Sequence, residues 1–226
     1  MKKIHYRNIG FPKTGTNWLW QQLGTHPQID GRFTDVSYKE YRAKDLASYK
    51  KIYEKYDITY NMDVHVFQYN DIEQYLRPEN IHSHATHLTM FLRSPYEILN
   101  SMYNMEQNRN PNFKFSKEAY TNITSEIVQR YSDMRTIFDY WKNSQIPVKY
   151  MFYDDLVKDP ENFMFEICNY LGLKPYYNDK KKIVFATDKK DPLVFDNKQT
   201  IDYINRGICV IEDTFNRDLS HWKNND

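Results

Sequence analysis

The sequence predicts an α/β fold in which a central, mostly parallel sheet is flanked by helices. β-type runs occur near residues 4–9, 58–67, 87–92 and 147–152, and a helical pattern follows each of them. No internal repeat or low-complexity linker divides the 226 residues, a length that is enough to bury a sizeable core. We therefore expect a single domain over residues 1–226.

Composition excludes several classes of protein. Apolar residues make up 40% of the chain and aromatic residues 16%, which argues against disorder. Lys and Arg number 31 against 30 Asp and Glu, so the net charge is only +1. No global field attracts nucleic acid or an anionic membrane. Any anion site must therefore be local.

The first residues and the cysteines predict the compartment. Met1, Lys2 and Lys3 are followed by a polar segment where a secretory signal needs an apolar run, and nowhere do 18 apolar residues run together. We expect a soluble, cytoplasmic protein without a membrane segment. Cys168 and Cys209 are too few for a disulfide framework and are expected to be reduced core thiols.

The first strand leads into a loop with the features of an anion site. Pro12-Lys13-Thr14-Gly15-Thr16 separates this strand from a helix whose first apolar residues are Trp18 and Leu19. Backbone N–H groups at a helix start, the positive end of the helix dipole and the nearby hydroxyl groups and lysine all favour a phosphate. A Walker loop has its lysine after the second glycine, whereas here Lys13 precedes Gly15. The alternative is an ordinary strand-to-helix turn.

Residues 58–67 alternate between an apolar and a mostly polar side. A parallel strand that is buried on both faces is normally apolar throughout, so the polar side predicts a strand that borders a cleft. Asp63 and His65 lie on this side, two residues apart, and either could act as a proton acceptor. The alternative is an edge strand with one solvated face.

The strand at 87–92 ends at Arg93, and the next helix has a well-marked start. Ser94 is a good N-cap, Pro95 suits the first helical position, and Glu97 would complete a capping box. Ser101 lies two turns into this helix. Ligands of open α/β sheets gather beyond the carboxyl ends of the strands, where Lys13 and Arg93 both fall. The alternatives are a solvated Lys13 and an Arg93 that merely pairs with Glu97.

Other features predict less. His82, His84 and His87 lack the helical spacing and additional ligands of a metal site, so no metal is expected. A long helix is expected over roughly 117–143. Residues 174–199, rich in lysine and aspartate, are expected to form a loop or lid.

Three segments resemble the sulfotransferases that use 3′-phosphoadenosine 5′-phosphosulfate (PAPS). Pro12 to Leu19 match the 5′-phosphosulfate loop of that family, with Asn17 where Thr or Ser is more frequent. Phe91 to Ser101 resembles the family's 3′-phosphate motif. Tyr153 to Pro160, with the helix behind it, is similar to the family's Tyr-Glu-Asp-Leu segment. The resemblance covers the chain from end to end and implies a P-loop-like sulfotransferase architecture.

The resemblance also implies roles for individual residues. Lys13 would donate to the oxygen that bridges phosphate and sulfate, where charge grows as the bond breaks, and Arg93 and Ser101 would hold the 3′-phosphate. Histidine or a carboxylate acts as the base in different branches, so His65 and Asp63 both stay candidates. The residues expected to shape the loop and hold the 5′-phosphate are Pro12, Lys13, Thr14, Gly15, Thr16, Asn17 and Trp18.

The expected activity is in-line transfer of a sulfuryl group from PAPS to a hydroxyl or amine, without a covalent enzyme intermediate and without a metal. The acceptor (a small molecule, a lipid or a sugar) and the oligomeric state cannot be read from the sequence. The glycine-rich C-terminal motif through which the cytosolic branch contacts the 3′-phosphate is not found in this sequence, and neither is the dimerisation motif of that branch. The alternatives are a P-loop-like nucleotide kinase and a non-catalytic nucleotide-binding module.

Overall fold

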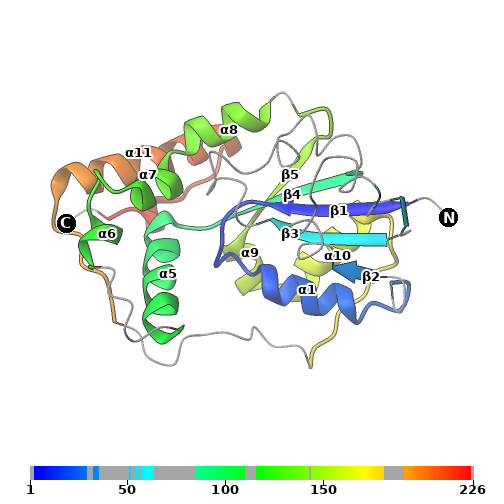
Figure 1. Cartoon of the computed structure of the whole chain (residues 1–226). Helices are drawn as coiled ribbons and strands as arrows, with labels where there is room; N and C mark the ends of the chain where they lie inside the picture. The colour runs from blue at the N-terminus through cyan, green and yellow to red at the C-terminus, as the bar shows by residue number, and fades with distance from the viewer. Residues whose placement is uncertain are drawn as a thin grey trace. The chain divides into compact units, whose positions relative to one another are not determined.

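The structure is a computed structural model that describes residues 3–29, 33–35, 51, 54–55, 58–63, 85–109, 116–142, 144–180 and 191–224. Among the described residues, helices follow the first, the fourth and the fifth strand, several in succession after each of the last two (Figure 1). The strands are β1 (Ile4–Ile9), β2 (Phe33–Asp35), β3 (Ile58–Asp63), β4 (His87–Leu92) and β5 (Val148–Phe152). The helices are α1 (Thr16–Gly24), α5 (Pro95–Arg109), α6 (Glu118–Thr121), α7 (Glu126–Ser132), α8 (Met134–Lys142), α9 (Tyr153–Lys158), α10 (Pro160–Leu171) and α11 (Lys198–Phe215), with a 3-10 turn at Ser220–Trp222.

The five strands form one parallel sheet in the order β2-β3-β1-β4-β5. The α/β prediction is confirmed, and so are the four strands that the sequence predicts. Residues 64–67 of the predicted third strand lie outside the described residues. The sequence analysis missed β2, which has only three residues and therefore too little pattern to detect.

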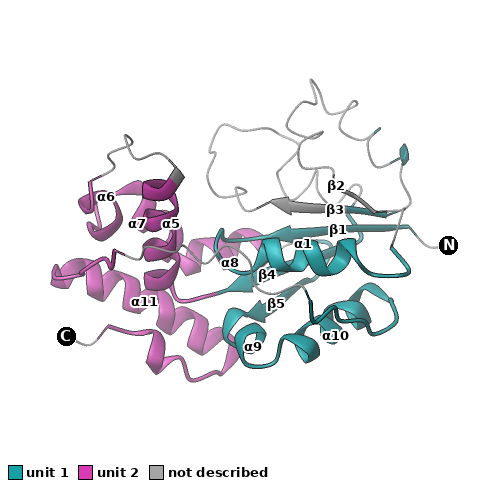
Figure 2. Ribbon diagram, turned by 90° about the horizontal axis from the view of Figure 1, so that it is seen from below, with its two compact units in different colours: residues 1–92, 144–184 teal, residues 93–143, 185–226 magenta. Residues whose placement is uncertain are grey.

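The chain forms two compact units (Figure 2). One comprises residues 1–92 and 144–184 and contains the whole sheet, and the other comprises residues 93–143 and 185–226. The expectation of a single domain stays a prediction.

In the first unit, α1 and α10 pack on one face of the sheet. Their apolar side chains form one buried cluster with residues from β1, β3, β4 and β5. Helix α10 is well capped: Asp159 accepts a hydrogen bond from the Asn162 N–H at 3.0 Å, and Gly172 ends the helix in a left-handed conformation. The members of the cluster are Ile4, Tyr6, Trp18, Leu19, Leu23, Ile29, Ile58, Phe91, Met151, Leu156, Phe163, Met164, Ile167, Cys168, Leu171 and Leu173.

The two sides of β3 face different surroundings. Ile58, on its apolar side, belongs to the core cluster. Thr59, on its polar side, is buried, and its hydroxyl lies 3.0 Å from Nδ1 of His5 on β1. Because β3 lies between β2 and β1, the alternative of an edge strand with one wet face is wrong.

The second unit is helical. Helix α11 contacts α5, α7 and α8, and its buried residues are Thr200, Ile201, Ile204, Gly207, Ile208 and Ile211. Gly207 lies so close to the backbone carbonyl of Ser132 that a Cβ atom there would clash with it. Glycine is therefore required for α7 and α11 to approach this closely.

The prediction of one long helix over 117–143 is wrong, because three short polar side chains divide it. Asn122 is extended and ends α6. Ser125 caps α7 by accepting from the Ile127 N–H at 3.2 Å. Asp133 accepts from the Thr136 N–H at 3.2 Å in the first turn of α8. Asn, Ser and Asp compete with the helix for backbone groups, and here the competition produces α6, α7 and α8.

Neither cysteine is in a disulfide. Cys168 is buried, and burial raises the pKa of its thiol, whereas Cys209 is only half-buried. Within the described residues, no helix combines the length and the apolar character needed to cross a bilayer. The cytoplasmic location stays a prediction.

Candidate functional site

The loop between β1 and α1 has an unusual backbone. Lys13 has a φ of 66° and Gly15 a φ of 95°, so both lie in the left-handed region. Lysine pays about 1–2 kcal/mol for that conformation, whereas glycine adopts it readily. Strain of this kind persists where the surrounding structure imposes it, and it clusters at functional sites. The backbone of the predicted anion loop thus shows a kind of strain that is frequent at functional sites, and the anion site itself stays a prediction.

Gly15 is also required by its neighbours. A Cβ atom built there would lie 2.5 Å from Cδ2 of Leu156 and 3.5 Å from Cε2 of Tyr153. Both neighbours belong to α9, which directly follows β5. Leu156 is fully buried in the core cluster, so it has little room to move. The Tyr-Asp-Asp-Leu segment, singled out by its sequence, thus packs against the loop at Gly15.

The first turn of α1 presents backbone donors. Gly15 occupies the N-cap position, where it offers no side-chain acceptor, and the first turn contains no acidic residue. The first bond within the helix runs from the Leu19 N–H to the Gly15 carbonyl at 3.0 Å. By helix geometry, the earlier N–H groups, at Thr16, Asn17 and Trp18, have no carbonyl partner inside the helix. The positive end of the dipole and these donors favour an anion.

The side chains of the loop divide into structural and accessible ones. The Thr14 hydroxyl is completely buried and donates to the Phe11 carbonyl at 2.8 Å, so in this structure it closes the loop. The Trp18 indole packs edge-on against Phe163 in the core, so it is the backbone N–H of Trp18 that could serve a ligand. Pro12 and Thr16 are buried, Lys13 is half-buried and Asn17 is exposed.

Arg93 and Ser101 belong to the second unit. The Arg93 Nε donates to Glu97 Oε2 at 2.7 Å, which is the pairing that the sequence analysis kept as an alternative. The Ser94 hydroxyl donates to the Trp222 carbonyl at 3.5 Å, and α5 begins at Pro95 as the sequence predicts. Ser101 is half-buried on α5.

The two candidate bases are only partly described. Asp63 is the last residue of β3, and its backbone pairs in register with Ile9 of β1, four residues before Lys13. The strand therefore brings Asp63 to the edge of the sheet from which the loop departs. His65 lies outside the described residues, and the choice between the two stays open at this point.

Comparison with known families decides the class of protein. The family profile described as the sulfotransferase domain matches residues 8–211, which is most of the chain. The chain belongs to the sulfotransferase domain family. The family that the sequence analysis recognised is thereby confirmed. Comparison with the sequences of curated proteins finds no match.

Solved structures share the fold of this sulfotransferase. A sulfotransferase from Alicyclobacillus acidocaldarius superposes with a TM-score of 0.60 at 16% identity, over 98% of this chain and 99% of that one. Mouse sulfotransferase SULT7A1, complexed with PAP, superposes with a TM-score of 0.55 at 16% identity, over 98% of this chain and 88% of that one. The sulfotransferase domain of the Synechococcus PCC 7002 olefin synthase gives 0.52 at 17% identity, over 97% of each chain. At such low identity these comparisons establish the fold alone.

The sequence analysis missed a set of bonds that ties α1 to the segment after α10. Gln22 exchanges two hydrogen bonds with the backbone of Asn178, at 3.0 and 2.9 Å. The buried His26 bonds the Lys174 carbonyl at 2.9 Å through Nε2, and Gln28 accepts from the Lys174 N–H at 2.6 Å. The sequence feature that could have indicated these bonds is the His26-Pro27-Gln28 segment, because it supplies two of the three bonding side chains. These contacts fix the far end of the helix whose N-terminus forms the anion loop.

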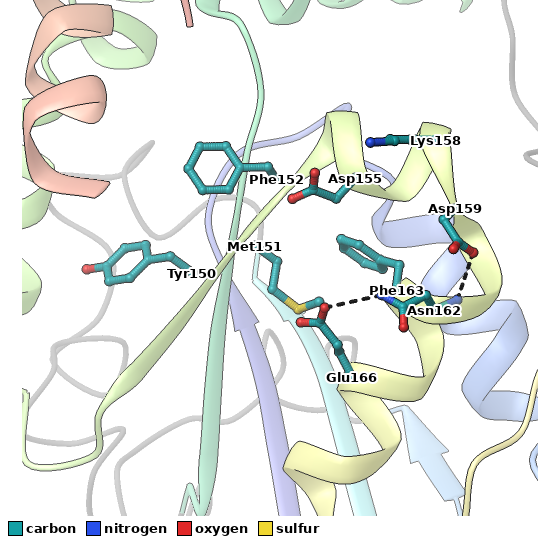
Figure 3. Close-up of a pocket in the computed structure, with 9 residues that line it drawn as sticks. All are labelled: Tyr150, Met151, Phe152, Asp155, Lys158, Asp159, Asn162, Phe163 and Glu166. Atoms are coloured by element: carbon teal, nitrogen blue, oxygen red, sulfur yellow. Dashed lines mark hydrogen bonds between the residues drawn. The ribbon is translucent and has the colours of Figure 1, made fainter. Parts of the chain in front are cut away.

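A cavity of about 330 Å³ lies beside β5, apart from the loop (Figure 3). Met151, Phe152 and Phe163 form a buried apolar floor, and charged side chains form the rim. No residue of the predicted site lines this cavity. Its lining residues are Tyr150, Met151, Phe152, Asp155, Lys158, Asp159, Asn162, Phe163 and Glu166.

No group of three or more His, Cys, Asp or Glu side chains in the described part of the chain could hold a metal ion. Of the predicted histidine cluster, only His87 is described, and its ring packs edge-on against Tyr170. The expectation of a metal-free site stays a prediction.

We expect Gly15→Ala to destabilise the sulfotransferase by roughly 2–5 kcal/mol. The new methyl group adds a left-handed backbone cost of about 1–2 kcal/mol and an overpacking cost of about 1–3 kcal/mol against Leu156. Chemical denaturation measures the change.

Gly172→Ala is the matched control. Gly172 also has a positive φ, of 69°, but a Cβ atom there meets nothing within 4 Å, so only the backbone cost applies. The difference between the two variants isolates the contact with Leu156. Equal losses would mean that this contact does not constrain the loop.

Proposed function

We propose that this sulfotransferase uses PAPS as its donor and transfers the sulfuryl group to a hydroxyl or amine of a small molecule, lipid or sugar. The observation that carries the proposal is the loop at residues 12–18, in which a strained lysine and a required glycine precede a helix start free of acidic side chains. That arrangement suits a phosphate next to a group that accumulates negative charge. SULT7A1, which shares the fold, was solved with PAP.

The residues of the loop fit the 5′ end of the donor. The N–H groups of Gly15, Thr16, Asn17 and Trp18 would hold the 5′-phosphate, and the Lys13 ammonium would donate to the oxygen that bridges phosphorus and sulfur. PAPS supplies an activated sulfuryl group when it is bound. Lys13 then offsets the charge that develops on the bridging oxygen, so the protein's contribution is positioning and electrostatic stabilisation.

Arg93 and Ser101 are proposed to hold the 3′-phosphate. The strands that lead to the loop and to Arg93, β1 and β4, are hydrogen-bonded neighbours in the sheet, and both elements leave it at the carboxyl ends. The side chain of Glu97, with which Arg93 forms an ion pair in this structure, is 55% exposed, so this pair is a weak one that a phosphate can replace.

The general base is proposed to be His65 or Asp63. A histidine with an ordinary pKa of about 6.5 accepts a proton near neutral pH, whereas a carboxylate near 4 needs desolvation to become as effective. A nucleotide kinase with a similar loop is the alternative activity. It is less well supported, because Lys13 is not in the Walker position and the chain belongs to the sulfotransferase domain family.

Ligand-induced stabilisation tests the donor. We expect adenosine 3′,5′-bisphosphate (PAP) to raise the free energy of unfolding by RT ln(1 + [L]/Kd) and the melting temperature with it. ATP with Mg²⁺ should leave the melting temperature nearly unchanged. Differential scanning fluorimetry over a range of ligand concentrations measures both. Stabilisation by ATP with Mg²⁺ alone would favour the kinase.

Lys13→Ala should reduce kcat for sulfuryl transfer by a factor of roughly 10² or more, the order expected for losing one charged donor to the transition state. Lys142→Ala, which removes an exposed lysine from α8, is the control for the change in net charge. Transfer from ³⁵S-labelled PAPS to a panel of phenols, sterols and sugars provides the readout. A nearly unchanged kcat would remove Lys13 from the mechanism.

Arg93→Ala should weaken PAP binding by about 10- to 100-fold, the loss expected for a hydrogen bond to a charged group, and Ser101→Ala should weaken it less. Neither should change the affinity for adenosine 5′-phosphate, which lacks the 3′-phosphate. Calorimetric titration with both nucleotides measures the difference.

Arg135→Ala, at an exposed position of α8, is the matched control, and Glu97→Gln reports what the ion pair alone contributes. Equal weakening of both nucleotides by Arg93→Ala would mean that the 3′-phosphate lies elsewhere.

A further inference from the structure

The cavity beside β5 reaches the core of the first unit, and the proposed chemistry does not use it. Its floor consists of Met151 and Phe152 of β5 and Phe163 of α10, whose side chains are all buried. Met151 and Phe163 also belong to the core cluster, and Figure 3 shows them between the strand and the helix. A molecule that enters this cavity therefore contacts the apolar core directly.

The size of the cavity suits a small organic molecule. Protein interiors are close-packed, and voids larger than a water molecule are few. This cavity measures about 330 Å³, which lies within the range of ligand pockets. An apolar cavity of about 150 Å³ takes up benzene, so the present one has room for roughly 12 non-hydrogen atoms, the size of a bicyclic ring with a short side chain.

The rim of the cavity has an excess of negative charge. Of the nine lining residues, Asp155, Asp159 and Glu166 carry carboxylates and Lys158 carries an ammonium group (Figure 3). Lys149, which does not line the cavity, lies 3.4 Å from Glu166 Oε2 and offsets one carboxylate in part. Carboxylates outnumber ammonium groups even when this lysine is included. An apolar floor under such a rim concentrates the field, so the cavity attracts cations and repels anions.

Floor and rim together select for an ammonium ion with an apolar body. Two phenyl rings and a thioether attract an aromatic group, and the faces of the rings also attract a cation. Such a ligand buries its body against the floor and keeps its charge at the rim, as a lysine side chain does on a protein surface. A metal ion would leave the floor unused, and in the described part of the chain no acidic group of the required size is suited to one.

We propose that this cavity is a second small-molecule site, separate from the anion loop, which binds an organic ammonium ion with an aromatic or similar apolar body. Helix α9 borders both places with different residues: Asp155 and Lys158 line the cavity, whereas Tyr153 and Leu156 face Gly15 of the loop. The proposal does not depend on the identity of the sulfuryl donor.

Three ligands that share an indole ring test the charge preference. Tryptamine is a cation, tryptophol is neutral and indole-3-acetate is an anion. Each is titrated into the full chain carrying ¹³C-labelled methionine methyl groups, and the NMR signal of Met151, assigned with Met151→Leu, reports binding. We expect tryptamine to shift this signal saturably with a Kd of about 1 mM or lower, tryptophol to bind more weakly and indole-3-acetate most weakly.

Met164 is the internal control for this titration. It is buried in the same core cluster but does not line the cavity, so its signal should shift much less than that of Met151. No saturable shift at Met151, or equal affinity for the three ligands, would overturn the proposal.

Variants of the rim test the carboxylates. Asp155→Asn combined with Glu166→Gln should weaken tryptamine roughly 3- to 30-fold and change tryptophol less than about 2-fold, because only the cation loses an attraction. Both side chains are exposed, so the fold should be unaffected, and Asp159 is kept because it caps α10. Equal weakening of the two ligands would contradict the preference for a cation.

Two further variants are controls. Glu161→Gln makes the same change of charge on α10 outside the cavity and should leave the affinity for tryptamine within about 2-fold. Lys13→Ala should also leave the Met151 titration unchanged, whether or not PAPS is the donor. A Met151 shift that disappears in Lys13→Ala would assign the ligand to the anion loop and overturn a separate site.

Discussion

The contact between Gly15 and Leu156 is the constraint on which the anion loop depends. The loop follows β1 and the leucine follows β5, so two segments separated by 141 positions in the chain meet where the ligand would bind. Leu156 is immobilised by the core that α1 and α10 form on the sheet. The left-handed turn at Gly15 is thus held by tertiary packing, and the strained Lys13 two residues earlier is held with it.

The other face of the sheet follows a different logic. Interior parallel strands are usually apolar on both sides, yet β1 and β3 carry His5, Arg7 and Thr59 on one buried side. Such groups lower stability unless each finds a partner, as His5 and Thr59 do with each other. These buried polar groups lie in the two strands that lead to the loop and to the candidate bases.

The features that a local sequence pattern determines could be predicted from the sequence. Contacts between residues far apart in the chain could not. The long parallel strands, the glycine-lysine loop and the start of α5 all leave a local signature, and the structure has each of them. The break of 117–143 into three helices also had a local signal, in Asn122, Ser125 and Asp133, which helical periodicity hid. The burial of Arg7 and the support of Gly15 by Leu156 had none, since each depends on residues far away in the chain.

The order of the strands has a consequence for how the chain is made. The central strand β1 leaves the ribosome first, but its neighbour β3 lies 54 positions later in register (Ile4 with Ile58), and β5 lies 60 positions after β4 (Leu88 with Val148). Residues 93–143, which belong to the other unit, are synthesised before the sheet can be completed. A nascent chain therefore carries exposed apolar strand edges through much of translation, and every pairing closes a long loop. The sheet can therefore be completed only after β5 has been made, and until then the growing chain exposes apolar strand edges that favour aggregation.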